Sequence, residues 1–154
     1  MRLLGWADDR VQMVGTGSLC YIEEKYDLRR ECYVKPHAFH ALASVMTAIC
    51  EDEIEALEAA HQLCAGNPEK SGSPAAKWFR PGETLRLAVF EDSVSGIKSV
   101  RNAAEVLRKW GYKAAAIACG IRTTDEKNKL LSDTGAELYD NINDALADVI
   151  RDSE

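Results

Sequence analysis

Short apolar runs alternate with amphipathic stretches through the second half of the chain, and no other feature of the sequence constrains the fold as strongly. Leu87–Phe90 and Ala114–Cys119 are continuous apolar runs of strand length. The stretch between them carries apolar residues three or four positions apart, which predicts a helix with one apolar face: Ile97, Val100, Ala104 and Leu107. Apolar strands separated by helices indicate a parallel sheet that is covered on both faces.

The pattern continues to the end of the chain. Asp125–Ser132 predicts a helix, Glu137–Tyr139 a short strand, and Ile142–Ile150 a last amphipathic helix. Gly111 follows the helix that carries Ile97 and Leu107, at the position where a helix commonly ends. We therefore predict an α/β fold, a three-layer Rossmann-like core with a mostly parallel sheet.

The first half of the chain carries weaker signals. Val11–Val14 and Cys32–Val34 predict short strands, and Leu19–Arg30 predicts a charged helix between them. Pro36 favours the start of a helix over Ala38–Cys50. The carboxylates of Glu51-Asp52-Glu53 favour the start of another helix, because the helix dipole attracts negative charge there.

The length of 154 residues suits a single domain, and we predict one domain over residues 1–154. Asn67–Glu83 holds three of the four prolines together with several Gly and Ser residues, so it predicts an exposed loop insertion. Trp78 and Phe79 within it are bulky and apolar, and we expect them to attach the loop to the body of the protein.

Charge and composition narrow the class of protein. The chain has 19 Lys and Arg against 25 Asp and Glu, a net charge of −6, which predicts no nucleic-acid partner. Apolar runs such as Lys113–Ile121 are far shorter than the roughly 20 residues of a membrane helix, so no membrane association is expected. The five cysteines are an odd number without a close pair, and no secretory signal follows Met1. We therefore expect a cytoplasmic location.

Three polar groups follow the predicted strands, where open α/β sheets bind their ligands. The Thr16 hydroxyl and the backbone around it suit an anionic oxygen, although a turn or cap residue is the commoner explanation of a single threonine there. Lys35 suits a phosphoryl group, although a single lysine is usually a solvated surface residue. The adjacent carboxylates Glu91 and Asp92 suit Mg²⁺, with helix capping as the alternative.

Taken together and in this order, these groups resemble the motifs of the haloacid dehalogenase-like hydrolase superfamily. The string Leu87-Ala-Val-Phe-Glu-Asp-Ser-Val-Ser-Gly-Ile97 resembles the family's fourth motif, in the branch of the phosphoglycolate phosphatases and beta-phosphoglucomutases. Val34-Lys35-Pro36 is similar to the third motif, and Met13-Val14-Gly15-Thr16-Gly17-Ser18 to the second. The resemblance is specific over Leu87–Asp144 and looser before it.

The resemblance implies a Mg²⁺-dependent phosphatase, a phosphoric monoester hydrolase, that acts on a small phosphorylated metabolite. Thr16 would bind the oxygens of the transferring phosphoryl group, and Lys35 would stabilise the charge of that group and of the nucleophilic aspartate. Asp92 would bind Mg²⁺ with the support of Glu91. Phosphoryl transfer depends mainly on positioning and on neutralising charge, which is consistent with these residue types.

One family motif is missing from the sequence. The family's nucleophile lies in an Asp-x-Asp sequence after a strand, and no Asp-x-Asp occurs in this chain. In the family that strand lies beside the strand of the fourth motif. We therefore expect the chain to correspond to the C-terminal part of the core, incomplete at its N-terminal side, inactive by itself and able to oligomerise through an exposed sheet edge.

Two other interpretations belong to different classes. A catalytically silent haloacid dehalogenase-like binding or regulatory module is the alternative explanation of the missing nucleophile. A plain nucleotide-binding Rossmann domain is disfavoured, because Gly15-Thr16-Gly17 lacks both the third glycine of the dinucleotide motif and the lysine of the P-loop.

Overall fold

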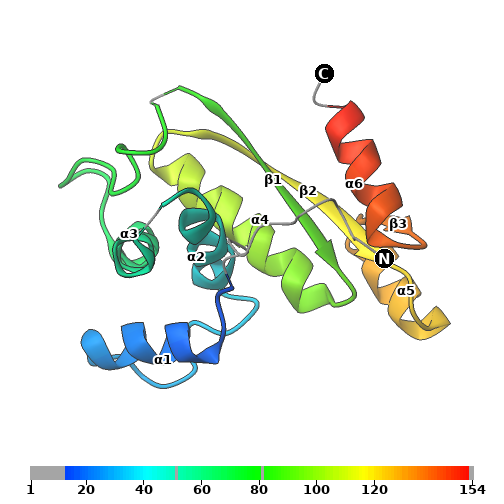
Figure 1. Ribbon diagram of the computed structural model, residues 1–154, viewed down its shortest axis with the longest axis horizontal. Helices are drawn as coiled ribbons and strands as arrows, with labels where there is room; N and C mark the ends of the chain where they lie inside the picture. The colour runs from blue at the N-terminus through cyan, green and yellow to red at the C-terminus, as the bar shows by residue number, and fades with distance from the viewer. Residues whose placement is uncertain (1–12, 51, 81, 153–154) are drawn as a thin grey trace.

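The computed structural model describes residues 13–50, 52–80 and 82–152, and it has an α/β fold built on a parallel sheet (Figure 1). The three strands of these described residues lie in the order β1-β2-β3, and both pairings are parallel. Helices connect successive strands, as parallel pairing requires. The elements of this half are β1 (Thr84–Glu91), α4 (Val94–Lys109), β2 (Lys113–Ile121), α5 (Asp125–Asp133), β3 (Glu137–Tyr139) and α6 (Ile142–Arg151).

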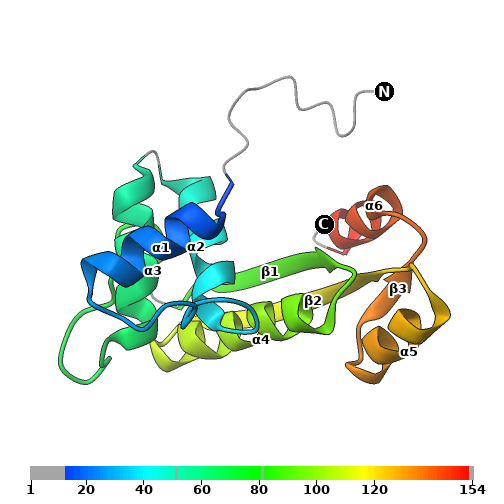
Figure 2. The same ribbon diagram turned by 90° about the horizontal axis from the view of Figure 1, so that it is seen from below.

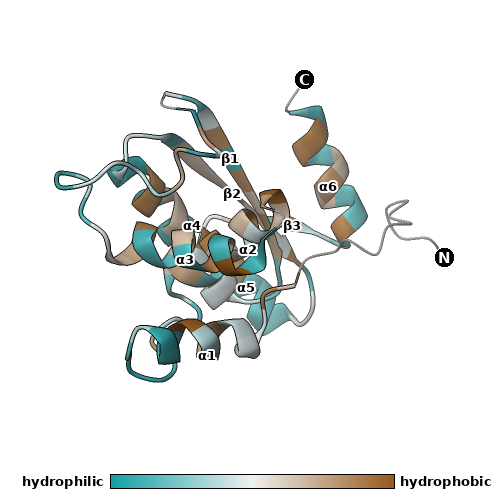
Figure 3. Ribbon diagram, turned by 60° about the vertical axis from the view of Figure 1, so that its left-hand side comes forward, coloured by the Kyte–Doolittle hydropathy of each residue, from teal (hydrophilic) through white to brown (hydrophobic). Residues whose placement is uncertain are grey.

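Helices cover both faces of the sheet. Figure 2 shows α4 and α5 on one side of the strands and α6 on the other. Successive side chains of a strand point to opposite faces, so the buried Leu85 and Leu87 of β1 lie on the face that α4 covers. In Figure 3 hydrophobic and hydrophilic bands alternate along α6, the pattern of a helix that rests on the sheet by one side only.

Within the described part of the chain, a layer of three helices precedes the sheet. It consists of α1 (Thr16–Lys25), α2 (Ala38–Ile49) and α3 (Glu53–Ala65). α2 packs against α3 and α4, and α1 packs against α3. The fully buried Phe39 of α2 and Leu107 of α4 belong to the same hydrophobic core. The helical layer and the sheet therefore share one core.

The predicted fold class and parallel sheet are confirmed, and the elements of the second half lie close to their predicted bounds. The two strands predicted in the first half are wrong where the structure describes them. Cys32–Val34 forms turns, and Met13 and Val14 are not in a strand; residues 11 and 12 lie outside the described residues. Cys32–Val34 adopts a turn because the buried carboxylate of Glu23 accepts hydrogen bonds from the backbone N–H groups of Glu31 and Tyr33.

The connecting segments also follow from local chemistry. α1 ends at Lys25, earlier than the predicted Arg30, and Asp27 adopts a left-handed backbone conformation with φ 51° that a helix cannot continue. The described part of Asn67–Glu83 contains no helix or strand, and Trp78 and Phe79 pack against the core as expected. Within the described residues, no helix has the length and apolar character needed to cross a membrane.

Candidate functional site

Lys35 and Glu91 form an ion pair at the carboxyl end of β1. Their side chains meet although the two residues are 56 positions apart in the sequence. The Lys35 side chain is 33% exposed and that of Glu91 is 17% exposed, so the pair is partly shielded from water. A partly buried pair of this kind is screened less by salt than a pair on the open surface.

Two side chains of α4 fix the backbone next to Lys35. Ser99 Oγ donates a hydrogen bond of 2.8 Å to the carbonyl of His37, and Asn102 Nδ2 donates one of 2.8 Å to the carbonyl of Pro36. Lys35 therefore owes its position to the helix that follows β1, which is also the helix next to Glu91.

Glu91 is held from its other side by the start of α4. Ser93 is the N-cap residue of α4, and its Oγ accepts a hydrogen bond from the N–H of Gly96 and donates one of 3.0 Å to Glu91 Oε2. A Cβ atom at Gly96 would lie only 2.1 Å from Cδ of Glu91. The space occupied by the Glu91 carboxylate therefore exists because residue 96 has no side chain.

A pocket of about 290 Å³ adjoins the ion pair, between α2, β1 and α4. Lys35, Glu91, His40 and Ser44 supply polar groups to its wall, and most of the remaining lining is apolar. Four consecutive residues, 86–89, line it. Because neighbouring side chains of a strand point to opposite faces, such a pocket must run along the edge of β1. Among the described residues, β1 has a neighbouring strand on one side only.

His40 is a pocket residue for which the sequence indicated only a structural role, as one of the pair His37 and His40 on a predicted helix. Burial lowers the pKa of its imidazole, and the positive charge of Lys35 lowers it further. The imidazole is therefore neutral at pH 7 and can offer a donor or an acceptor to a molecule in the pocket. The available signal was its place five positions after Lys35, on a helix predicted to begin at Ala38.

Asp92 forms an ion pair with a different lysine from the one that pairs with Glu91. Asp92 Oδ2 lies 3.0 Å from Lys127 Nζ, in an ion pair whose two side chains are about half exposed. Lys127 lowers the pKa of the Asp92 carboxyl through this contact. Lys127 belongs to α5, and its distance along the chain gave no sequence signal for this pairing.

The residues of the site do not form a magnesium site by themselves. Mg²⁺ prefers six oxygen ligands in octahedral geometry. Glu91 and Asp92 each hold a lysine, and the described residues contain no group of three or more His, Cys, Asp or Glu side chains placed to hold a metal ion. The donor set expected for Mg²⁺ is thus reduced to two carboxylates with separate partners.

Thr16 lies on α1, a different element from those that carry the other predicted site residues. It is the first residue of α1 and is exposed, so the expectation that it ends a strand is wrong. Among the described residues, no hydrogen bond or ion pair joins it to Lys35, Glu91 or Asp92. The neighbouring Ser18 contacts Glu53 of α3 instead, which places this end of α1 against the helical layer.

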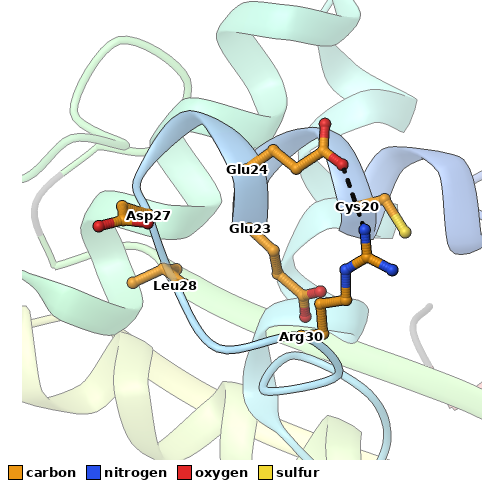
Figure 4. Close-up of a pocket in the computed structure, with 6 residues that line it drawn as sticks. All are labelled: Cys20, Glu23, Glu24, Asp27, Leu28 and Arg30. Atoms are coloured by element: carbon orange, nitrogen blue, oxygen red, sulfur yellow. Dashed lines mark ion pairs between the residues drawn. The ribbon is translucent and has the colours of Figure 1, made fainter.

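Another pocket lies at α1 and is shown in Figure 4. Arg30 Nη2 and Glu24 Oε1 are 4.0 Å apart across it, the contact drawn as a dashed line. Glu23 is only 3% exposed, but its carboxylate already accepts the two backbone hydrogen bonds that hold the turn after α1. The carboxylate of Glu23 therefore has a structural role.

Comparison of the chain with protein-family models, with curated proteins and with solved structures gave no match. The chemistry of the site therefore has to be inferred from its geometry.

Proposed function

We propose that this chain is a haloacid dehalogenase-like phosphatase core whose Lys35–Glu91 pocket receives the phosphoryl group of a small phosphorylated metabolite. The observation that supports it is the meeting of Lys35 and Glu91 at the carboxyl end of β1. This end of an open parallel sheet is where such folds bind their ligands.

The role of each residue follows from its contacts. The Lys35 ammonium supplies the positive charge for a phosphoryl oxygen, and charge-assisted hydrogen bonds of this kind are stronger than neutral ones. Glu91 holds that ammonium at the rim of the pocket. His40 and Ser44 are the neutral polar groups that line the same pocket. Thr16 is not among the described residues that line this pocket.

The chemical step needs groups that this set does not contain. The sequence has no Asp-x-Asp, so no carboxylate takes the role of the family's nucleophile. In the family that the chain resembles, the strand that carries the nucleophilic aspartate lies beside the strand of the fourth motif. The edge of β1 next to the pocket, which is unpaired among the described residues, corresponds to that position. No step is assigned to Mg²⁺, because Glu91 and Asp92 are each held by a lysine. We expect this chain to bind a phosphate monoester without hydrolysing it.

A titration with phenyl phosphate, followed by the backbone amide signals of an isotope-labelled sample, tests the proposal. Saturable shifts are expected at Lys35, Glu91 and Gly96. Lys35→Ala should weaken binding by about tenfold or more, the equivalent of one charge-assisted hydrogen bond. Lys77→Ala is the matched control, because Lys77 also pairs with a glutamate, Glu55, but lies outside the pocket. Equal affinity in the two variants would contradict the proposal.

A catalytically silent binding module is the second candidate, and one observation favours it. The lysines of the site are already neutralised by the carboxylates that a metal ion would need. An in-frame upstream segment that ends in a strand and Asp-x-Asp would favour the phosphatase. Phosphate binding by a stable 154-residue product that lacks such a segment would favour the silent module.

A further inference from the structure

A pocket of about 320 Å³ lies at the opposite end of the sheet from Lys35 and Glu91. Its wall includes Trp110, which lies just before β2, and residues of the loop that leads to β1. It is therefore near the amino ends of the strands. Figure 1 shows the loop after α3, in green, on the side of the molecule away from α6. This pocket is independent of the site proposed above.

Aromatic rings form much of this pocket. Tyr26 and His61 stack with ring centroids 3.8 Å apart and an interplanar angle of 21°. Trp110 is fixed by a hydrogen bond of 2.9 Å from its indole N–H to the carbonyl of Leu63. Gly66 lets the indole approach, since a Cβ there would lie 2.9 Å from the Trp110 ring. These rings are therefore rigid surfaces for stacking.

His61 brings a hydrogen-bond donor to the pocket. Its Nδ1 lies 2.6 Å from the hydroxyl of Tyr33, and burial raises the pKa of that hydroxyl, which keeps its proton. Among the described residues, the Tyr33 hydroxyl has no other hydrogen-bond acceptor, so His61 Nδ1 accepts its hydrogen bond. Burial lowers the pKa of His61, so the imidazole is neutral and its single proton is on Nε2.

The Nε2–H group has no partner among the described residues, although His61 is only 8% exposed. All fully buried side-chain nitrogen and oxygen atoms of the described residues have a partner. Nε2 must therefore reach solvent, and the pocket that His61 lines is its opening. None of the described side chains that line this pocket carries a formal charge, whereas Gln62 and Ser71 add neutral polar groups.

We propose that this pocket binds a small neutral heteroaromatic ring, such as a nucleobase, which stacks on its aromatic wall and accepts a hydrogen bond from His61 Nε2. Stacking is tolerant of ring type. The donor selects rings that carry an acceptor, and the uncharged lining disfavours charged ligands, because a buried charge needs a partner.

Adenosine is the probe, and the indole N–H signal of Trp110 reports its binding. A saturable shift is expected at Trp110, whereas Trp78, which does not line this pocket, should not respond. Indole, which is planar but has no good acceptor, should bind about tenfold more weakly, the equivalent of one hydrogen bond. No saturable shift with adenosine, or an equal shift at Trp78, would overturn the proposal.

Variants separate the donor from the cavity. His61→Phe keeps an aromatic ring against Tyr26 but removes the donor, so adenosine should bind no better than indole. His61→Phe also leaves the Tyr33 hydroxyl without its hydrogen-bond partner. Ala65→Leu therefore tests the cavity independently, because the larger side chain at the end of α3 makes the pocket smaller. Ala65→Leu should weaken adenosine binding severalfold, and Ala48→Leu, an exposed control on α2, should not. Unchanged affinity in Ala65→Leu would also overturn the proposal.

Discussion

The sheet region, residues 84–152, and the helical region, residues 13–80, are stabilised in different ways. In the sheet region each strand pairs with the next, and β1 and β2 stay in register from Thr84–Lys113 to Glu91–Gly120. In the helical region the irregular segments depend on distant partners, such as the hydrogen bonds of Ser99 and Asn102 to the backbone around Lys35. The placement of Lys35 therefore depends on α4.

The shared core provides the largest test of this comparison. Phe39→Ala, at a fully buried position of α2, should lower the free energy of unfolding by about 3–5 kcal/mol. Because Phe39 and Leu107 belong to one core, circular dichroism and tryptophan fluorescence should report a single coincident transition on denaturant unfolding. Ile49→Ala, exposed on the same helix, should change little. Two separate transitions would show that the regions fold independently.

The glycine at the start of α4 provides a smaller effect. Gly96→Ala should destabilise the protein by about 1–3 kcal/mol through the clash with Glu91, less the roughly 1 kcal/mol that alanine gains in a helix. Gly96→Ala should also weaken phenyl phosphate binding. Glu91 would move away from Lys35 and would no longer hold the ammonium at the rim of the pocket. Gly17→Ala on α1 has open space around its Cβ and should be neutral or stabilising in the same unfolding measurement. A stabilised Gly96→Ala protein would contradict this account.

Removing one anchor of the Lys35 backbone should cost less. Asn102→Ala should lower stability by about 0.5–1.5 kcal/mol and increase hydrogen exchange at His37. Asn141→Ala, which removes the N-cap of α6, should cost a similar amount without a change at His37. Equal hydrogen-exchange rates at His37 in both variants would show that Asn102 does not stabilise the backbone next to Lys35.

The response to acid involves groups of the helical region first. Burial lowers the pKa of His37, His40 and His61 below 6.5 in the folded protein. The unfolded chain then binds more protons as the pH falls through 6.5, so stability should decrease from that point downwards. Asp92, whose pKa Lys127 lowers, adds a loss of the same sign only below about pH 3.8. Urea midpoints at pH 7.5 and 5.5 measure the first loss, and equal midpoints would contradict it.

Prediction from the sequence succeeded where local periodicity decides the structure. Glu137–Tyr139 has its predicted bounds, and both Ile97 and Leu107 of α4 are buried as predicted, because apolar spacing alone specifies these elements. The prediction for Cys32–Val34 failed because the deciding partner, the buried carboxylate of Glu23, lies on α1, ten residues before Tyr33 and outside the local apolar run. A run of three apolar residues cannot outweigh such a tertiary contact.

The candidate site divides in the same way. Lys35 and Glu91 were singled out by residue type and by the strand that ends at Glu91, and the structure brings them together. The partnership of Asp92 with Lys127 depends on how α5 lies against the end of β1, which no local pattern encodes. The exposed position of Thr16 follows from the start of α1 at that residue, where a strand had been predicted.

The close contact between residues 91 and 96 makes these two positions a coupled pair. A side chain can be accommodated at 96 when the residue at 91 is shorter, and that exchange would leave the Lys35 ammonium without its carboxylate. Proteins that share this strand-to-helix turn should therefore change both positions together or neither, and such paired variation would reveal whether the lysine still needs its acidic neighbour.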